Sequence, residues 1–523
     1  MVSRSLVAPS SLVFVAASLG VALAGTPRED RERQKLVSPA YNFSAGMIEG
    51  LGATPGGAQD IGFFRDRVTA GEVPHPNVFT PEGLFSEHDL PLRHEGACKQ
   101  LLCMTGEATS AMMIVQPEVQ WLAQVGFDSG LSPKTWKRAP LDLIAVIDKS
   151  GSMSGQPLAL VKESLLQVAS QLGPDDRLGV VLYGDRSYVH LPMTAGSDKA
   201  ALVQGVAAIE SAGSTNMEEG LKVAYDLAKR SLATRQKGAT TRVMLFTDER
   251  PNVGATDAAS FLGMAEQASK DGIGLTTVGV GVQFGAELAT KISAVRGGNL
   301  FFFPDVLTMK TKFQDELDTL VTELAYDLDM VVSPAPGVRI AGVYGVPGQM
   351  LAWSPDHRTI SLHISTIFLS KKSGAIYVAL GSDTADALPQ TTLPVGGELA
   401  SVRVDYTPRG KAAETSEVAL RLAAPEQASI GLLRGRLLVD EVTTLKQATA
   451  LHHEKNDQEG AYQLVHAIAS ILRQTSDPEL ASERQLTTQL EATLAKLSGH
   501  AGEPPTATNA PPVDPVSGLP TLR

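Results

Sequence analysis

The segment that most constrains the fold is Leu141–Pro157, where an unbroken apolar run leads directly into a short polar loop. Leu143–Ile147 has the composition of a strand that is buried on both faces of a parallel sheet. The polar loop Asp148–Met153 follows, and Pro157 opens a segment whose apolar residues recur at helical spacing. The order predicts a strand, a loop and a helix. In open α/β sheets, ligands bind at the carboxyl ends of the strands.

The loop contains oxygen donors suited to a small divalent cation. Asp148 offers a carboxylate, Ser150 and Ser152 offer hydroxyls, and Gly151 lets the backbone turn tightly. Hard oxygen donors of this kind suit Mg²⁺, which keeps several of its waters, and they do not suit zinc. By itself, the same loop is equally compatible with a turn that only caps the following helix.

Three segments in order resemble the metal-ion-dependent adhesion site of von Willebrand factor type A domains. Asp148-x-Ser150-x-Ser152 resembles the first segment of that motif. Ser211–Asn216 resembles the loop that supplies a threonine ligand, which is Thr215 in this chain. One such segment is a weak signal, whereas three in the family's order are a strong one.

The third segment, Val243–Asp248, resembles the strand that ends in the motif's second aspartate. The chain departs from the family pattern directly afterwards, where Glu249-Arg250 replaces the usual glycine. This departure bears on partner specificity more than on metal binding. The resemblance implies a Mg²⁺ or Mn²⁺ ion held by five residues: Asp148, Ser150, Ser152, Thr215 and Asp248.

The resemblance implies a divalent-cation-dependent function in adhesion or assembly and no enzymatic activity. Neutral hydroxyl ligands leave the ion's charge poorly cancelled, so the ion accepts an Asp or Glu carboxylate from a protein partner. One alternative is a metal-dependent hydrolase, although no candidate general base accompanies the motif. Another is a structural envelope module whose metal site is satisfied from within the chain.

Composition narrows the partner classes. The chain has 523 residues, of which 43% are hydrophobic and 20% are charged, so it can form several domains with substantial cores. Its formal net charge is −12 and no basic cluster stands out. Nucleic acid and anionic membrane surfaces are therefore not expected partners.

The amino-terminal residues predict a secretory signal peptide over residues 1–24. Arg4 precedes the apolar run Leu12–Leu23, and Ala22-Leu23-Ala24 fits a small-x-small cleavage site. The alternative is an uncleaved membrane anchor, but the run is short for a span. We expect an exported protein of the periplasm, cell surface or medium, with no transmembrane span after cleavage.

The two cysteines, Cys98 and Cys103, lie close together in the sequence. In an exported protein such a pair indicates a local disulfide. Free thiols remain an alternative, and so does a metal site, although nearby His94 supplies only one further ligand.

The central residues 139–325 predict a doubly wound, mostly parallel α/β sheet, because helical and strand patterns alternate. Gly184–Arg186 is long enough only for a hairpin, so one edge strand should run antiparallel. Residues 25–110 are expected to form an N-terminal module. Within it, Phe63–Phe85 resembles the region that precedes the type A domain in exported bacterial proteins.

The remaining segments predict a β-sandwich and a helical end. Residues 326–422 alternate apolar and polar residues between turn signals, and residues 111–138 should supply further strands of that sandwich. The α/β domain would then be inserted between strands of the sandwich. Residues 423–498 show apolar stripes at helical spacing, and residues 499–523 have the composition of a disordered tail.

Overall fold

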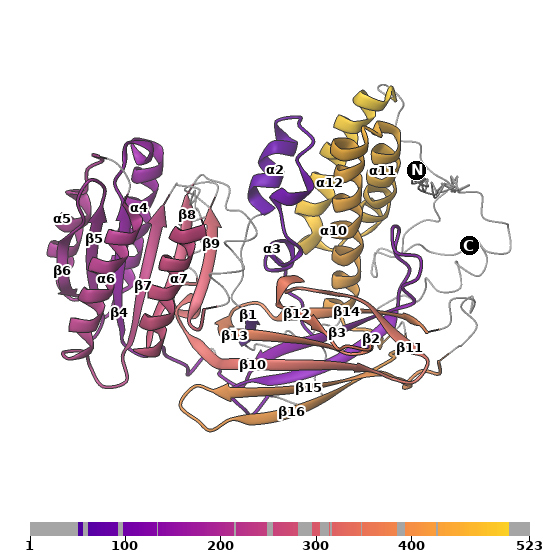
Figure 1. Ribbon diagram of the computed structural model, residues 1–523, viewed down its shortest axis with the longest axis horizontal. Helices are drawn as coiled ribbons and strands as arrows, with labels where there is room; N and C mark the ends of the chain where they lie inside the picture. Colours follow the sequence, from indigo (N-terminus) through magenta and orange to yellow (C-terminus); the bar gives the residue numbers. More distant parts are fainter. Residues whose placement is uncertain are drawn as a thin grey trace, which may run out of the picture.

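The computed structural model describes residues 51–55, 61–92, 98–132, 134–213, 216–247, 255–280, 295–303, 313, 316–346, 348–383, 393–424 and 427–500. The predicted signal peptide and all of the predicted tail beyond residue 500 lie outside these ranges. The described residues form an α/β domain, a curled antiparallel sheet and a helical unit that packs on the sheet (Figure 1).

The α/β domain is built on a six-stranded sheet with the order β6-β5-β4-β7-β8-β9. Its strands are β4 (Leu141–Asp148), β5 (Arg177–Tyr183), β6 (Tyr188–Ala195), β7 (Thr240–Thr247), β8 (Ile273–Val280) and β9 (Gly298–Phe303). All neighbours pair in parallel except β5 and β6, which are antiparallel. The predicted mostly parallel sheet with one antiparallel edge strand is confirmed.

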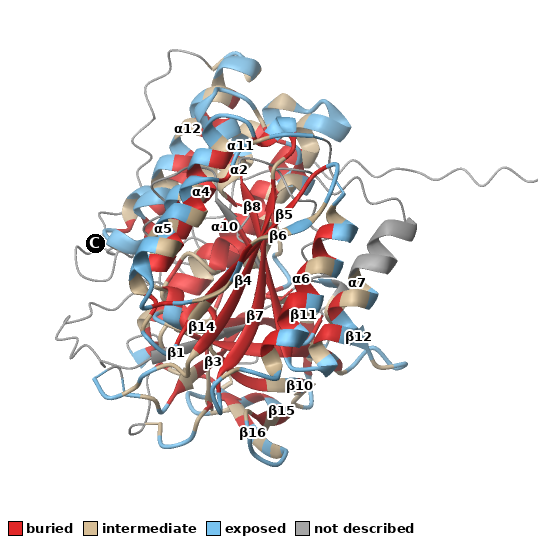
Figure 2. Ribbon diagram, turned by 90° about the vertical axis from the view of Figure 1, so that its left-hand side faces the viewer, coloured by how far each residue is buried: buried red, intermediate tan, exposed pale blue. Residues whose placement is uncertain are grey.

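Helices cover both faces of this sheet. They are α4 (Gln156–Gln171), α5 (Lys199–Ala207), α6 (Met217–Leu232) and α7 (Ala255–Lys270). Successive residues of a strand point to opposite faces. Leu143, Ala145 and Ile147 of β4 accordingly pack with α4 and α5, whereas Ile144 and Val146 pack with α6. Strands β4, β7 and β8 are therefore buried along their whole length (Figure 2).

The second sheet has ten strands and curls over on itself. Its main path is β11-β14-β3-β1-β13-β10-β15-β16, with β12 paired to β13 and β2 paired to β3. The strands are β1 (Leu51–Pro55), β2 (Cys103–Ser110), β3 (Trp121–Ser129), β10 (Glu323–Pro334), β11 (Val338–Tyr344), β12 (Leu351–Trp353), β13 (Ile360–Ser370), β14 (Gly374–Ser382), β15 (Glu398–Pro408) and β16 (Glu414–Arg421). The curl brings β2 against β16, where Ala108 bridges Leu422.

One apolar core fills this curled sheet, with side chains from both of its halves, such as Val125 and Val404. The expected sandwich is thus a single continuous sheet folded over, not two separate sheets. The expected strand positions also need correction. Residues 111–138 were expected to supply further strands, but among the described ones only β3 is a strand; residues 111–120 form its connection to β2, which lies before residue 111.

Strand β3 pairs with β14 from Trp121 opposite Leu380 to Phe127 opposite Gly374. The α/β domain therefore leaves the sheet after β3 and returns to it at β10. Strands from both sides of the insertion share one core, and this ties the α/β domain to the sheet at two chain crossings.

The helical unit contains α10 (Ile430–Lys455), α11 (Gln458–Gln474) and α12 (Ala481–Ser498). Two short helices from the N-terminal region, α2 (Ile61–Thr69) and α3 (Pro81–Phe85), share its apolar core. The expected N-terminal module is therefore not separate, because its described residues divide between this unit and the curled sheet. None of the helices in the described ranges is long and apolar enough to cross a membrane.

Arg242 of β7 joins the α/β domain to the curled sheet. Its side chain is fully buried and donates hydrogen bonds to Thr276 Oγ1 at 2.9 Å and to the Gly297 carbonyl at 3.0 Å. It also pairs with the Glu323 carboxylate at the start of β10, and it lies over the Phe368 ring of β13. Burial lowers the pKa of Arg242, and the charge of Glu323 opposes that effect. One buried cation thus contacts both domains.

Candidate metal centre

Asp148 is the last residue of β4 and has no exposed surface. Its Oδ1 accepts a hydrogen bond from the Ser150 backbone N–H at 2.8 Å. Its Oδ2 accepts from Thr247 Oγ1 at 3.4 Å. Thr247 ends the neighbouring strand β7, so the parallel pairing of the two strands sets this contact. The carboxylate is thereby oriented at the carboxyl edge of the sheet.

The two serines lie on a 3₁₀ turn at the same edge. Ser150 precedes the turn and Ser152 is within it, and their hydroxyl oxygens are 2.9 Å apart. Ser150 is buried, whereas Ser152 is exposed. Met153 is completely buried and anchors the turn against the sheet and α4. The loop therefore presents one hydroxyl from the interior and one from the surface.

A second loop, residues 211–213, is held against the Asp148 loop by backbone hydrogen bonds. The Ala212 N–H donates to the Lys149 carbonyl at 2.7 Å, and the Gly151 N–H donates to the Gly213 carbonyl at 3.2 Å. Gly213 has a φ of +92°, and a Cβ there would overlap the side chain of Asp185. Glycine is thus required where the two loops meet, immediately before the segment that contains Thr215.

The structure brings together three of the five predicted ligands. Asp148, Ser150 and Ser152 share one edge of the sheet, as the sequence predicted. Thr215 and Asp248 lie outside the described residues. Their described neighbours are Gly213, at the contact above, and Thr247, whose hydroxyl donates to Asp148.

The donor set fits a hard divalent cation. Mg²⁺ prefers octahedral coordination at about 2.0–2.1 Å, so adjacent ligand oxygens lie about 2.9 Å apart. The hydroxyls of Ser150 and Ser152 have this separation. Within the described ranges, no group of three or more His, Cys, Asp or Glu side chains is arranged to hold a metal. The candidate centre consists instead of a carboxylate and hydroxyls.

Thr247 is the residue here that the sequence reasoning missed. It is fully buried and its hydroxyl positions the Asp148 carboxylate. The available signal was its place at the end of an apolar strand, one residue before Asp248. The contact could be inferred only after β4 and β7 were known to be neighbours.

Comparison with known proteins assigns the α/β domain to a family. Residues 142–316 match the family model of the von Willebrand factor type A domain. The chain is 30% identical to the uncharacterised protein YfbK of Escherichia coli (strain K12) over 189 residues, which are 36% of this chain and 32% of YfbK. It is 26% identical to human inter-alpha-trypsin inhibitor heavy chain H4 over 172 residues, which are 32% of this chain and 18% of that protein.

The chain spans about a third of YfbK and less of the human protein. A solved structure described as von Willebrand factor type A from Catenulispora acidiphila has a TM-score of 0.46 and 14% identity, and the match covers 77% of this chain and 98% of that one. The matched residues coincide with the α/β domain and with the edge that carries Asp148. Residues 142–316 of this chain therefore constitute a von Willebrand factor type A domain.

Proposed function

We propose that Asp148, Ser150, Ser152, Thr215 and Asp248 bind Mg²⁺ or Mn²⁺ and that the bound ion captures a protein partner. Support comes from the buried Asp148 carboxylate beside two hydroxyls at the separation expected for adjacent ligands of one ion. The hydroxyls and Asp148 would hold the ion from one side. Thr215 and Asp248 are assigned by resemblance to the family's motif.

The ion would supply a positive charge that recognises an Asp or Glu carboxylate of the partner. Hydroxyl ligands are neutral, so the bound ion keeps much of its charge and gains by accepting one more anionic oxygen. Ser152 is exposed, which is the side from which such a carboxylate would approach. Adhesion or assembly, in which two proteins are joined through one ion, is the function that this arrangement supports best.

Calorimetric titration of the full chain with Mg²⁺ and with Mn²⁺ tests the metal site. We expect saturable binding in the wild type and none in the Asp148→Ala protein. Lys149→Ala is the matched control, because its ammonium group donates to the Ala212 carbonyl at 3.0 Å and no carboxylate ligand is removed. Wild-type protein that binds neither ion would contradict the proposal.

Capture of partner proteins with and without chelator tests the second half of the proposal. Loss of capture with chelator supports recognition through the ion. A hydrolase would instead turn over phosphoesters or peptides in a Mg²⁺-dependent manner, and the motif supplies no candidate base for that reaction. A structural module with an internally satisfied site would bind the ion and capture no partner through it.

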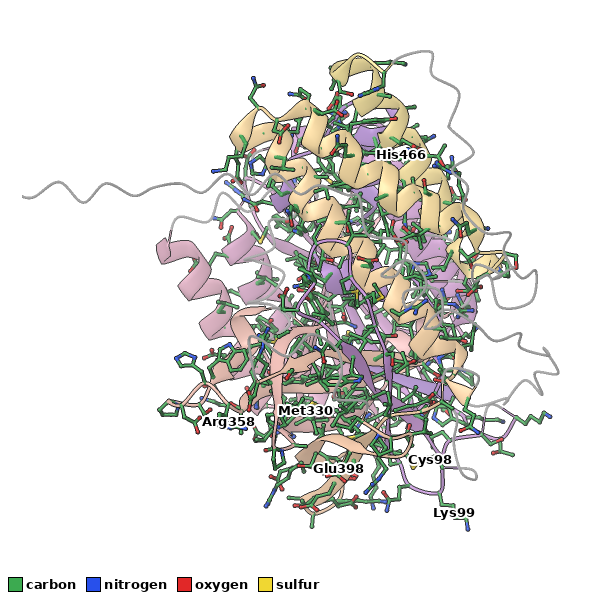
Figure 3. The ribbon with its side chains drawn as sticks, turned by 90° about the vertical axis from the view of Figure 1, so that its right-hand side faces the viewer. Cys98, Lys99, Met330, Arg358, Glu398 and His466 are labelled. Carbon is green, nitrogen blue, oxygen red and sulfur yellow. A yellow bond between two sulfur atoms is a disulfide. The ribbon has the colours of Figure 1, made fainter. Side chains whose placement is uncertain are left out.

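We further propose that the protein is exported, to the periplasm, the cell surface or the medium. Cys98 and Cys103 form a disulfide, and Cys98 lies beside Lys99 at the edge of the curled sheet (Figure 3). Such bonds persist in oxidising compartments. The predicted signal peptide lies outside the described residues, so cell fractionation of the full chain is the test.

A further inference from the structure

We propose that the junction between the type A domain and the curled sheet contains a binding site for a small carboxylate with an apolar body. A cavity of about 240 Å³ lies there, at the amino ends of β4 and β7. These are the opposite ends of the strands that carry Asp148 and Thr247, so the site is separate from the candidate metal centre (Figure 1).

Both chain crossings and both domains contribute to the cavity wall. The outgoing crossing supplies Trp136 and Arg138, and the returning crossing supplies Thr322 and Leu324. Backbone hydrogen bonds hold these segments in place, including one from the Arg409 N–H to the Leu324 carbonyl at 2.8 Å. The cavity is therefore a built feature of the junction.

Among the described residues, the ion pairs of the wall leave one cation, Arg409, without a carboxylate partner. Arg138 is neutralised, because it forms ion pairs with Asp176 at 2.6 Å and Asp318 at 2.5 Å. Glu323 is engaged as well: it pairs with Arg242, and its other oxygen accepts from the Tyr326 hydroxyl at 2.5 Å. Each carboxylate oxygen of Glu323 is thus engaged by a residue other than Arg409.

Arg409 is the remaining cation of the wall. It is half-buried in the turn after β15, and its guanidinium donates to Thr240 Oγ1 at 2.9 Å. No carboxylate of the described residues forms an ion pair with it. A guanidinium presents five N–H donors in a planar fork that matches a carboxylate in a two-bond arrangement. The free donors of Arg409 therefore specify an anionic oxygen pair on the ligand.

The rest of the wall specifies the ligand's body and size. Leu101, Leu131 and Trp136 add apolar surface to the cavity wall. Pockets for drug-sized ligands measure about 300–1,000 Å³, so a cavity below that range admits only a small molecule. An aliphatic or aromatic monocarboxylate of roughly ten non-hydrogen atoms satisfies both requirements.

Octanoate and its neutral isostere octanamide are matched probes for this site. We expect calorimetry on the full chain, in the absence of divalent cations, to show octanoate bound at one site and octanamide at least tenfold more weakly. Arg409→Gln should weaken octanoate binding at least tenfold, and Arg409→Lys should bind with intermediate affinity. Arg403→Gln is the control, because Arg403 is exposed on β15 and paired with Asp405 at 3.1 Å.

Hydrogen exchange locates the bound probe. Octanoate should slow amide exchange in residues 136–141 and 321–324, because both crossings line the cavity. Equal binding of octanoate and octanamide to the wild type would overturn the proposal, and this comparison does not depend on how well any variant folds. The proposal would also be overturned if a folded Arg409→Gln protein bound octanoate as tightly as the wild type, or if the wild type bound no octanoate at millimolar concentration. Slower exchange in other parts of the chain instead of these two segments would overturn it as well.

Discussion

Asp148 and Glu441 are both carboxyl groups with no exposed surface, yet their surroundings differ. Asp148 accepts hydrogen bonds from the Ser150 backbone N–H and the Thr247 hydroxyl at the open edge of a sheet. Glu441 lies inside the helical unit, where burial and the charge of the nearby Glu483 raise its pKa well above the usual range. The neutral donors orient the Asp148 carboxylate at the sheet edge, whereas the buried Glu441, which faces a second carboxylate, takes up a proton more readily.

The Glu441 region is also a structural junction. Arg65 of α2 pairs with Glu87 and, at 2.6 Å, with Glu483 of α12, and His88 contacts the same Glu483 oxygen at 3.0 Å. Glu441 itself is in α10. The cluster therefore ties residues near the start of the described chain to the last helices. The edge at Asp148, by contrast, draws its described contacts from within the type A domain. The Glu441 region should therefore govern stability, and the edge at Asp148 should govern ligand binding.

The largest expected effect is at Arg65. Arg65→Ala leaves the Glu483 carboxylate buried without its cation, and loss of one member of a buried pair costs about 3–5 kcal/mol. Urea unfolding followed by circular dichroism measures this change. Arg67→Ala is the matched control on the same helix, because the Arg67–Glu72 pair is about half exposed and should contribute no more than about 1 kcal/mol. Equal stability of the two variants would contradict the prediction that the buried cluster around Glu441 governs stability.

The metal site should affect the stability of the protein only when Mg²⁺ is bound. At a Mg²⁺ concentration 100 times the dissociation constant, the wild type should gain about 2.7 kcal/mol of unfolding free energy. The Asp148→Asn protein should gain nothing from Mg²⁺. Thermal unfolding with Mg²⁺ and with chelator provides the measurement. A similar Mg²⁺ gain in both proteins would show that the ion binds elsewhere.

The contact of the helical unit with the sheet should be intolerant of a single methyl group. A Cβ at Gly435 of α10 would overlap the ring of Tyr377 in β14, so Gly435→Ala should cost about 1–3 kcal/mol despite the better helix propensity of alanine. Gly263→Ala in α7 is the control of opposite sign. It has open space around it and should gain up to about 1 kcal/mol. Chemical unfolding of both variants tests this reversal.

The last prediction concerns pH. Folded Glu441 keeps its proton to a higher pH than the same group in the unfolded chain, so rising pH lowers the unfolding free energy between the two pKa values. The slope for one proton is at most about 1.4 kcal/mol per pH unit. Glu441→Gln removes this term, so its stability relative to the wild type should increase from pH 4.5 to pH 8.

Other carboxyl groups, among them Glu82, Asp440 and Asp89, also have pKa values raised by burial and are present in both proteins. Burial raises the pKa of Glu82 to about 7 and that of Asp440 to about 6. Arg65, Glu483 and Asp440 are the charged groups that act on Glu441, and the variant leaves them unchanged. A stability difference that stays constant over this pH range would show that Glu441 does not carry the proton.

The comparison of the Asp148 edge with the Glu441 region also shows which features could be predicted from the sequence. The strand, loop and helix around Asp148 are local features that the sequence predicted, and three of the five proposed ligands lie within five residues, so the sequence alone places these three on one loop. Strand β2 (Cys103–Ser110) was missed, because the burial of its side chains does not alternate. It pairs with the following strand β3, and β16, from far along the chain, packs against it. The contact between Arg65 and Glu483 spans 418 residues and has no local signature.

The sequence by itself determined the type A domain, its antiparallel edge strand and the oxygen donors at its carboxyl edge, because strand period, turn length and donor chemistry are written in adjacent residues. The sequence also predicted that residues before and after this domain share one β-structure, and only the tertiary structure decided that it is a single curled sheet. The tertiary structure also decided that α2 and α3 belong to the C-terminal helical unit, and that Arg409 lines a cavity in which no carboxylate of the described residues forms an ion pair with it. These outcomes depend on contacts between buried surfaces and charged groups that lie hundreds of residues apart in the sequence. The local sequence pattern does not specify which of these groups come into contact.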